Sequence, residues 1–303
     1  MNNATEVIQV IPFQKAVRAL LSMLPCVFFL YINGVMLFAL LKKPLLLETS
    51  RYVLFGHLLF TESVQLLVTM LLYLFAFTMV RMVSYVCVTV SLLAGITVKM
   101  SPLNLAVMSL ERYVAICFPL RHVDIVTTRK TSIAIAVMWT VASLDSLTQM
   151  FLFISLESTG FTLQTFCTKK SVFRLKIFTT VNNAFTIVYF VLVGMIIIYT
   201  YIAIMFAVKS ASGNVRNASR ACRTVLLHLL QLCLCLTSTL FNIINSNNML
   251  PPHIQYAFFL GLIVLPKCLS PLIYGLREHA LRHVLKYYFT FGIKTTIRPY
   301  PKS

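Results

Sequence analysis

Charged residues are scarce in this sequence. Only eight of the 303 residues are Asp or Glu, and charged residues of both signs make up 11%, against about 25% in a typical soluble domain. Apolar residues make up 59%, and the mean hydropathy is +0.86. This composition argues against a water-soluble globule, and therefore against a soluble enzyme domain or a nucleic-acid-binding module.

Motifs for bound metals and for redox chemistry are also missing. The eight cysteines include no Cys-x-x-Cys pair, the sequence His-Glu-x-x-His does not occur, and histidines do not cluster with cysteines. Zinc sites and thiol redox centres are normally signalled by such spacings. We therefore expect a protein with no metal, no cofactor and no enzymatic activity.

The basic residues dominate the charge that is present, giving a net charge of +18. In a soluble protein this excess would suggest a nucleic-acid partner. Here most Lys and Arg residues lie in short segments between apolar stretches. That distribution is typical of a membrane protein, in which basic residues mark the cytoplasmic loops.

Seven apolar runs are each long enough to cross a bilayer, which takes about 20 apolar residues in a helix. Each run is expected to be a helix, because backbone polar groups have no water partner in hydrocarbon. The predicted fold is an all-α membrane protein, a single seven-transmembrane helix bundle. The runs are Ala19–Leu41, Tyr52–Met79, Val83–Ile116, Ser132–Ile154, Phe178–Ala207, Thr224–Asn245 and Ile254–Leu276.

The segments outside the runs predict the orientation. With residues 1–18 outside the cell, sixteen of the 26 Lys and Arg residues fall in cytoplasmic segments and seven in outer ones, as the positive-inside rule favours. Asn3 then begins a glycosylation triplet on the outer side, whereas the triplet at Asn217 is cytoplasmic and silent. Residues 277–303 form the cytoplasmic tail, in which Arg277–Tyr288 is expected to be an amphipathic eighth helix on membrane lipid, or else a solvated segment.

An acid next to an arginine ends the third run, within Met108-Ser-Leu-Glu-Arg-Tyr-Val-Ala-Ile-Cys-Phe-Pro-Leu120. Glu111 and Arg112 can form an ion pair, and breaking it would free a strong hydrogen-bond donor. The run resembles the Asp/Glu-Arg-Tyr motif of rhodopsin-like G-protein-coupled receptors, and more closely a signature of odorant receptors. The seventh run ends Leu-Ser-Pro-Leu-Ile-Tyr-Gly-Leu-Arg277, which is similar to fish-type odorant receptors.

Further landmarks extend this resemblance along the chain. Asn33 matches a polar residue of the family's first span, and Thr200-Tyr201 resembles a Ser-Tyr pair of the fifth. Cys87 and Cys167 are the two cysteines that we place outside the bilayer, so a disulfide between them is chemically allowed.

The chain also departs from the family pattern. Glu62 stands where Asp is usual, and Ser270 replaces the usual Asn before Pro271. The fifth run has no proline, and the sixth lacks a Trp-x-Pro sequence. Odorant receptors lack that last sequence as well, which favours this subfamily.

Besides Glu111 and Arg112 at the end of the third run, four charged residues lie deep inside the runs, where a charge costs at least about 2.5 kcal/mol and usually finds a partner. Glu62 and Lys267 lie at similar depth and are predicted to pair where related receptors hold sodium; alternatively Glu62 is neutral or binds sodium while Lys267 faces water. Lys99 is either the partner of Asp145 or the cationic anchor of an anionic ligand. The expected buried polar network comprises Asn33, Glu62, Lys267 and Ser270.

The resemblance implies a ligand pocket in the outer half of the bundle. Amide side chains on apolar walls can bind ligand oxygens or amines, but they can equally bond to neighbouring helices. The ligand-facing residues that it implies are Ala94, Gly95, Val98, Lys99, Asn182, Asn183, Thr186, Phe241, Asn242 and Asn245.

The same resemblance implies an allosteric receptor of the plasma membrane. A small odorant shifts the conformational population, Arg112 leaves Glu111, and the cytoplasmic side admits a heterotrimeric G protein of the olfactory stimulatory type. A receptor for a peptide or lipid is the main alternative; a transporter or channel would use the buried charges, but no inverted repeat is visible. The implied switch residues are Glu111, Arg112, Tyr113, Tyr201, Pro271 and Tyr274.

Overall fold

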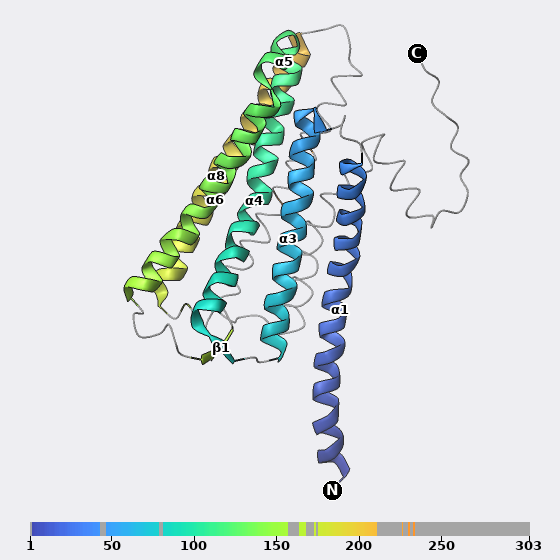
Figure 1. Ribbon diagram of the computed structural model, residues 1–303, viewed down its shortest axis with the longest axis vertical. Helices are drawn as coiled ribbons and strands as arrows, with labels where there is room; N and C mark the ends of the chain where they lie inside the picture. Colours follow the sequence, from blue (N-terminus) through green and yellow to red (C-terminus); the bar gives the residue numbers. More distant parts are fainter. Residues whose placement is uncertain are drawn as a thin grey trace, which may run out of the picture.

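The computed structural model describes five long helices and the short elements between them (Figure 1). The described residues are 2–42, 47–78, 81–156, 164–167, 173, 175–210 and the separate positions 226, 230 and 233. Apart from those three positions, the predicted sixth and seventh spans and the predicted amphipathic helix lie outside the described residues.

The long helices correspond to the first five predicted spans. Each contains a segment long and apolar enough to cross a membrane. Apart from the start of the first helix, the observed ends lie within four residues of the predicted ones, so the apolar runs located these helices well. The helices are α1 (Asn2–Leu41), α3 (Ser50–Thr78), α4 (Ser84–Cys117), α6 (Thr128–Leu156) and α8 (Lys176–Ser210).

Helix α1 begins much earlier than its predicted span. It comprises 40 residues starting at Asn2, which corresponds to about 60 Å at 1.5 Å per residue, twice the thickness of the hydrocarbon layer. The part suited to crossing the membrane is Met23–Leu41. Hydropathy indicates where a helix lies in lipid, and it carries no information about how far the helix continues beyond it.

Short elements lie at the two ends of the bundle. The 3-10 helix η1 (Pro119–Arg121) and helix α5 (His122–Ile125) connect α4 to α6. Strand β1 (Arg81–Val83) pairs antiparallel with β2 (Gln164–Phe166), with Met82 opposite Thr165. Figure 1 places β1 and the N-terminus towards one end and α5 at the other. The two strands were not predicted from the sequence, because three residues are too few to show an alternating pattern.

Helix α4 is at the centre of the packing. It contacts α3, α6 and α8, whereas α1 packs against α3. The main core cluster draws side chains from α3, α4, α6 and α8, so these four helices share one apolar interior. Its buried members are Leu54, Leu58, Met100, Leu103, Leu105, Ala106, Met108, Met138, Ala142, Val193 and Ile197.

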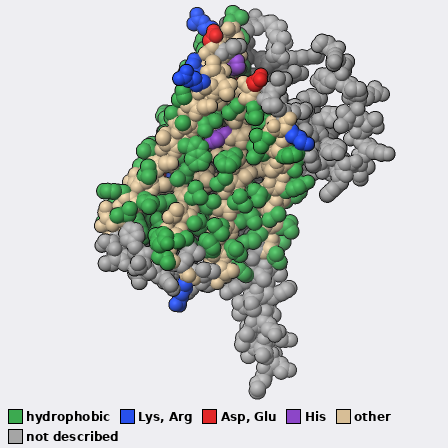
Figure 2. Space-filling view, viewed as in Figure 1, with side chains coloured by type: hydrophobic (Ala, Val, Ile, Leu, Met, Phe, Trp, Pro, Cys, Tyr) green, Lys and Arg blue, Asp and Glu red, His purple; other side chains and the backbone are tan. Residues whose placement is uncertain are grey.

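The outside of the described helices is also apolar. On α8, Ile187, Val191, Met195 and Ile198 follow one another at helical spacing and are each more than half exposed. Figure 2 shows hydrophobic side chains over the middle of the visible face, with Lys and Arg nearer the ends. Helices that are apolar on both sides are typical of membrane spans, because lipid replaces water as their solvent.

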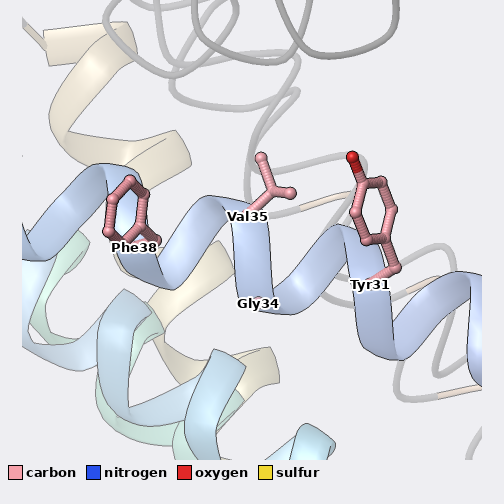
Figure 3. Close-up of a pocket in the computed structure, with 4 residues that line it drawn as sticks. All are labelled: Tyr31, Gly34, Val35 and Phe38. Carbon is pink, nitrogen blue, oxygen red and sulfur yellow. The ribbon is translucent and has the colours of Figure 1, made fainter.

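A shallow groove runs along one side of α1. It is lined by Tyr31, Gly34, Val35 and Phe38, which lie on one side of two successive helical turns (Figure 3). Tyr31 and Phe38 are at least half exposed, and the lining carries almost no polar surface. None of the residues predicted to bind a ligand lines this groove.

Two hydrogen bonds of one histidine link three helices inside the apolar core. The Trp139 indole on α6 donates to His57 Nε2 on α3 at 3.0 Å, and His57 Nδ1 lies 3.1 Å from Asn104 Oδ1 on α4. Since an indole N–H can only donate, Nε2 must accept, and the proton sits on Nδ1 and is donated to Asn104. His57 is therefore neutral and links α3, α4 and α6.

We expect Trp139→Phe to lower the thermal stability of the purified protein. Phenylalanine has no N–H, so His57 Nε2 loses its donor inside the bundle, at a cost of about 1–3 kcal/mol. The melting temperature in detergent measures the effect. Thr140→Ala is the matched control, because Thr140 is exposed and bonds to carbonyls of its own helix. Equal melting temperatures for wild type and Trp139→Phe would contradict the expectation.

Candidate functional site

A charged cluster lies at the end of α4 that carries η1 and α5. Glu111 Oε2 is 3.4 Å from Arg112 Nε, and Glu111 Oε1 is 3.8 Å from His122 Nε2. The Glu111 side chain is 8% exposed and that of Arg112 20%. The predicted Glu111–Arg112 ion pair is confirmed. The contact with His122 was missed, because only the turn through η1 brings this residue back to Glu111.

Aromatic rings join α4 to α8 at the same end. The Tyr113 ring lies edge-on to Phe118 at 5.8 Å and to Tyr199 at 5.9 Å, between ring centroids. Cys117 Sγ is 4.0 Å from a backbone carbonyl oxygen of α8. Tyr113 therefore contributes to the α4–α8 contact beside Arg112, and Tyr201 lies half-buried on α8. The two switch residues predicted in the seventh span, Pro271 and Tyr274, lie outside the described residues.

The predicted buried polar network is described in part. Glu62 is 1% exposed, and its Oε1 accepts a hydrogen bond from Ser101 Oγ on α4 at 2.7 Å. Asn33 is also 1% exposed, and its amide has no hydrogen-bond partner in the part of the chain that the structure describes. Lys267 and Ser270 lie outside the described residues, so the Glu62–Lys267 pair stays a prediction.

A second buried run of polar side chains crosses α4, α6 and α8, and we call it the polar bridge: Lys99, Asp145, Gln149 and Asn182. Lys99 Nζ donates to Asp145 Oδ2, and Gln149 Nε2 donates to Asp145 Oδ1 at 2.8 Å. The same Gln149 nitrogen is 3.5 Å from Asn182 Oδ1. Lys99, Asp145 and Gln149 are each less than 9% exposed.

The polar bridge contains the Lys99–Asp145 ion pair, one of the two alternatives for Lys99. Lys99 and Asp145 were predicted to lie at similar depth, whereas Gln149 was not predicted to join them. A signal was present, because Gln149 follows Asp145 by four residues and therefore lies on the same side of α6. Ligand binding by Lys99 and Asn182 stays a prediction.

Other residues predicted to face a ligand lie on α4 and α8. Ala94, Gly95, Asn183 and Thr186 are half-buried, and Val98 is 47% exposed. A Cβ added to Gly95 would lie 3.6 Å from Ser146 Oγ, so this position of α4 faces α6. The three residues predicted in the sixth span, Phe241, Asn242 and Asn245, lie outside the described residues.

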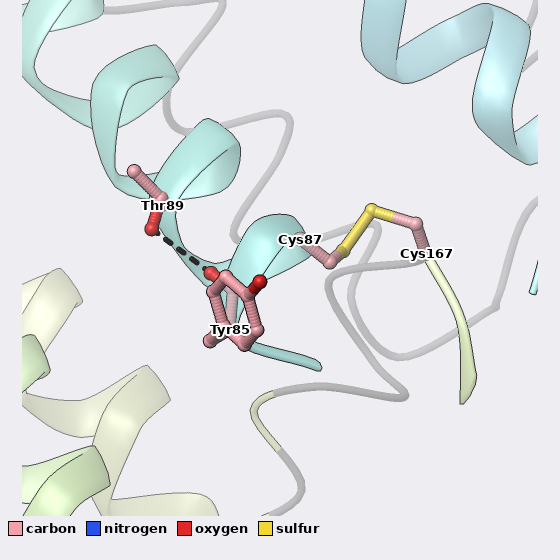
Figure 4. Close-up of a disulfide and its surroundings, with 4 residues drawn as sticks. All are labelled: Tyr85, Cys87, Thr89 and Cys167. Atoms are coloured by element: carbon pink, nitrogen blue, oxygen red, sulfur yellow. Dashed lines mark hydrogen bonds between the residues drawn. A yellow bond between two sulfur atoms is a disulfide. The ribbon is translucent and has the colours of Figure 1, made fainter. Parts of the chain in front are cut away.

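A disulfide closes the end of the bundle opposite α5. Cys87 and Cys167 are bonded, with their Cα atoms 5.5 Å apart (Figure 4). The β1–β2 pair precedes both cysteines and brings them together. Both cysteines are almost fully buried, in a cluster that includes Phe153 and Phe178. The predicted disulfide is confirmed, and it fixes the loop after α6 to the start of α4.

Comparison with known proteins agrees with this arrangement. The family model of the 7 transmembrane receptor (rhodopsin family) matches residues 32–274. The chain is 35% identical over 279 residues to Odorant receptor 131-2 of Danio rerio. The alignment covers 87% of this chain and 83% of that protein. The chain belongs to the rhodopsin family of seven-transmembrane receptors.

A second, more distant relative points the same way. The receptor is 24% identical over 192 residues to Olfactory receptor-like protein OLF4 of Canis lupus familiaris, covering 61% of this chain and 62% of that protein. The family match runs from α1 to Tyr274 and covers the predicted sixth span and all but the last two residues of the predicted seventh. The receptor is therefore a seven-helix membrane protein and not an enzyme, and the resemblance to odorant receptors is confirmed.

We expect Lys99→Ala to reduce the amount of receptor at the cell surface severalfold. The substitution leaves the Asp145 carboxylate buried without its cation, which costs about 3–5 kcal/mol. Surface antibody labelling relative to total receptor measures the effect. The double substitution Lys99→Met with Asp145→Leu removes both charges and is expected to restore surface levels.

The alternative role of Lys99 gives a different result in the same experiment. If Lys99 anchors an anionic ligand, Lys99→Ala leaves the surface level intact and abolishes the response to acidic ligands. That outcome would contradict a structural role for the ion pair.

Proposed function

We propose that the receptor binds a small odorant molecule in the outer half of its helix bundle and activates a heterotrimeric G protein at its cytoplasmic end. The observation that carries the proposal is the 35% identity to Odorant receptor 131-2 over 87% of the chain. The site residues are consistent with it, because the interior holds polar groups that can bind a ligand, and the Glu111–Arg112 pair lies at one end.

The proposed mechanism is a shift in population between two conformations. Arg112 is paired with Glu111 in the described conformation, and Glu111 also lies near His122. A ligand that binds the active conformation more tightly raises its population. Arg112 then separates from Glu111, and its guanidinium becomes a hydrogen-bond donor at the surface that the G protein contacts.

Several finer features belong to the same proposal. The G protein is the olfactory stimulatory type, which raises cyclic AMP. The receptor lies in the plasma membrane with its N-terminus outside the cell and carries a glycan at Asn3. The orientation is supported by basic residues at the α5 end of the bundle, including Arg121, Arg129 and Lys130, since cytoplasmic loops are enriched in Lys and Arg. Residues 277–288 rest on membrane lipid.

We expect Arg112→Ala to abolish the cyclic-AMP response to an activating odorant while the receptor still reaches the cell surface. The change removes the guanidinium that contacts the G protein, and it leaves the ligand pocket intact. A cyclic-AMP reporter in cells expressing the receptor, screened with volatile and water-soluble odorants, measures the response per surface receptor. Arg129→Ala is the matched control, because Arg129 is an exposed arginine at the start of α6. An undiminished response in Arg112→Ala argues against this mechanism.

We expect an epitope tag at the N-terminus to be labelled on intact cells, and a tag after Ser303 only after permeabilisation. Positive-inside loops and an odd number of spans place the two ends on opposite sides of the membrane. Asn3→Gln is expected to remove one glycan, seen as a faster-migrating band. Labelling of the C-terminal tag on intact cells reverses the proposed orientation.

A further inference from the structure

The positive charge of Lys99 is already compensated within the polar bridge. Asp145 uses both carboxylate oxygens, one for Lys99 and one for Gln149. The Lys99 ammonium also lies 5.5 Å from the centroid of the Tyr189 ring, within cation–π range. The Tyr189 hydroxyl donates to the Val141 carbonyl on α6, which holds that ring in place.

An anionic ligand at Lys99 would have to displace Asp145 or share the ammonium with it, because a lysine ammonium has three N–H donors. Displacing Asp145 would move a carboxylate whose side chain is 1% exposed, and sharing the Lys99 ammonium would hold two like-charged carboxylates around one cation. A displaced Asp145 carboxylate would be a buried charge without its cation, which is strongly unfavourable. The polar bridge therefore disfavours acidic ligands, although it contains a lysine.

The accessible end of the polar bridge is uncharged. Asn182 on α8 is half-buried, whereas the other three members are buried. Thr186 follows Asn182 by four residues and therefore lies on the same side of α8, and it is also half-buried. An amide and a hydroxyl both donate and accept hydrogen bonds. Together they suit a carbonyl or hydroxyl group on a neutral molecule.

We propose that the ligand of the receptor is an uncharged molecule with a carbonyl or hydroxyl group that hydrogen-bonds to Asn182, and that the Lys99–Asp145 ion pair excludes carboxylates. This inference rests on the proposed function and names its ligand class. It makes Lys99 a residue of helix packing and selectivity, and it makes Asn182 the ligand-binding member of the bridge.

The test compares carboxylic acids with their own methyl esters and with the matching alcohols, so that the carbon skeleton stays constant. At neutral pH the acids are ionised and the other compounds are not. Cyclic AMP per surface receptor is measured for wild type and for Asp145→Asn. The wild type is expected to respond to esters or alcohols at lower concentrations than to acids. Asp145→Asn frees the Lys99 charge, so the potency of an acid relative to its ester is expected to rise about tenfold.

Three further variants separate the charge effect from damage to the fold. The double variant Lys99→Met with Asp145→Leu has no charge in the bridge, so it is expected to keep the ester response without gaining an acid response. Asn182→Ala is expected to raise the ester concentration that gives a half-maximal response about tenfold, because a hydrogen bond to the ester is lost. Leu147→Ala is the matched control on α6, because Leu147 is 63% exposed, and it is expected to change neither response.

Different results contradict the inference alone or the inference together with the proposed function. A wild-type receptor that responds to acids at concentrations equal to or below those of their esters overturns the inference and leaves the proposed function standing. If Asp145→Asn reaches the surface and the potency of an acid relative to its ester is unchanged, the inference is overturned and the proposed function still stands. If this variant stays inside the cell, the wild type, the double variant and Asn182→Ala decide the question. A surface-expressed wild type that responds to no compound contradicts both the proposed function and the inference.

Discussion

Water is absent from the middle of a bilayer, so polar side chains between membrane helices must find partners on one another. Apolar contacts alone do little to choose one helix arrangement, because lipid tails are as apolar as leucine. Polar pairs are more selective, since each requires two particular residues at one depth. In this receptor, α4 supplies one member of each of these contacts between helices: Ser101 with Glu62, Asn104 with His57, and Lys99 with Asp145.

The position of α4 also connects the two proposed functional regions. Lys99 and Arg112 are thirteen residues apart on this helix, or about 20 Å along its axis. Helix α8 contacts α4 near both of them, through Tyr189 at Lys99 and through Tyr199 at Tyr113. A ligand at Asn182 would therefore touch a helix that also packs beside the switch arginine. This gives the proposed population shift a continuous physical route.

The sequence predicted most where a single physical quantity decides the outcome. Hydropathy located α3, α4, α6 and α8 to within a few residues, because the membrane demands a continuous apolar stretch. Depth and charge balance together suggested the Lys99–Asp145 pair as one of two alternatives, the other being an anchor for an anionic ligand. The cysteine pair followed from the family resemblance and from placing both residues outside the bilayer. Each of these predictions depends on position along the membrane normal, which can be counted along the chain.

Contacts that depend on rotation and on neighbours were not predictable in this way. Gln149 connects Asp145 to Asn182 on α8 because of how α6 is rotated against α8, and His122 returns to Glu111 through a turn that no periodicity reports. The β1–β2 pair is too short to have a pattern, and the extension of α1 to Asn2 has no hydropathy signal.

The amino-acid order by itself thus determined a membrane-spanning helical receptor, the depth of its charges and the ion pair at the end of α4. The tertiary structure alone decided which polar groups of different helices meet, and it paired the charge of Lys99 with Asp145 while Asn182 stayed accessible. The physical reason is that depth is a property of one helix, whereas pairing requires two helices to present their side chains to each other.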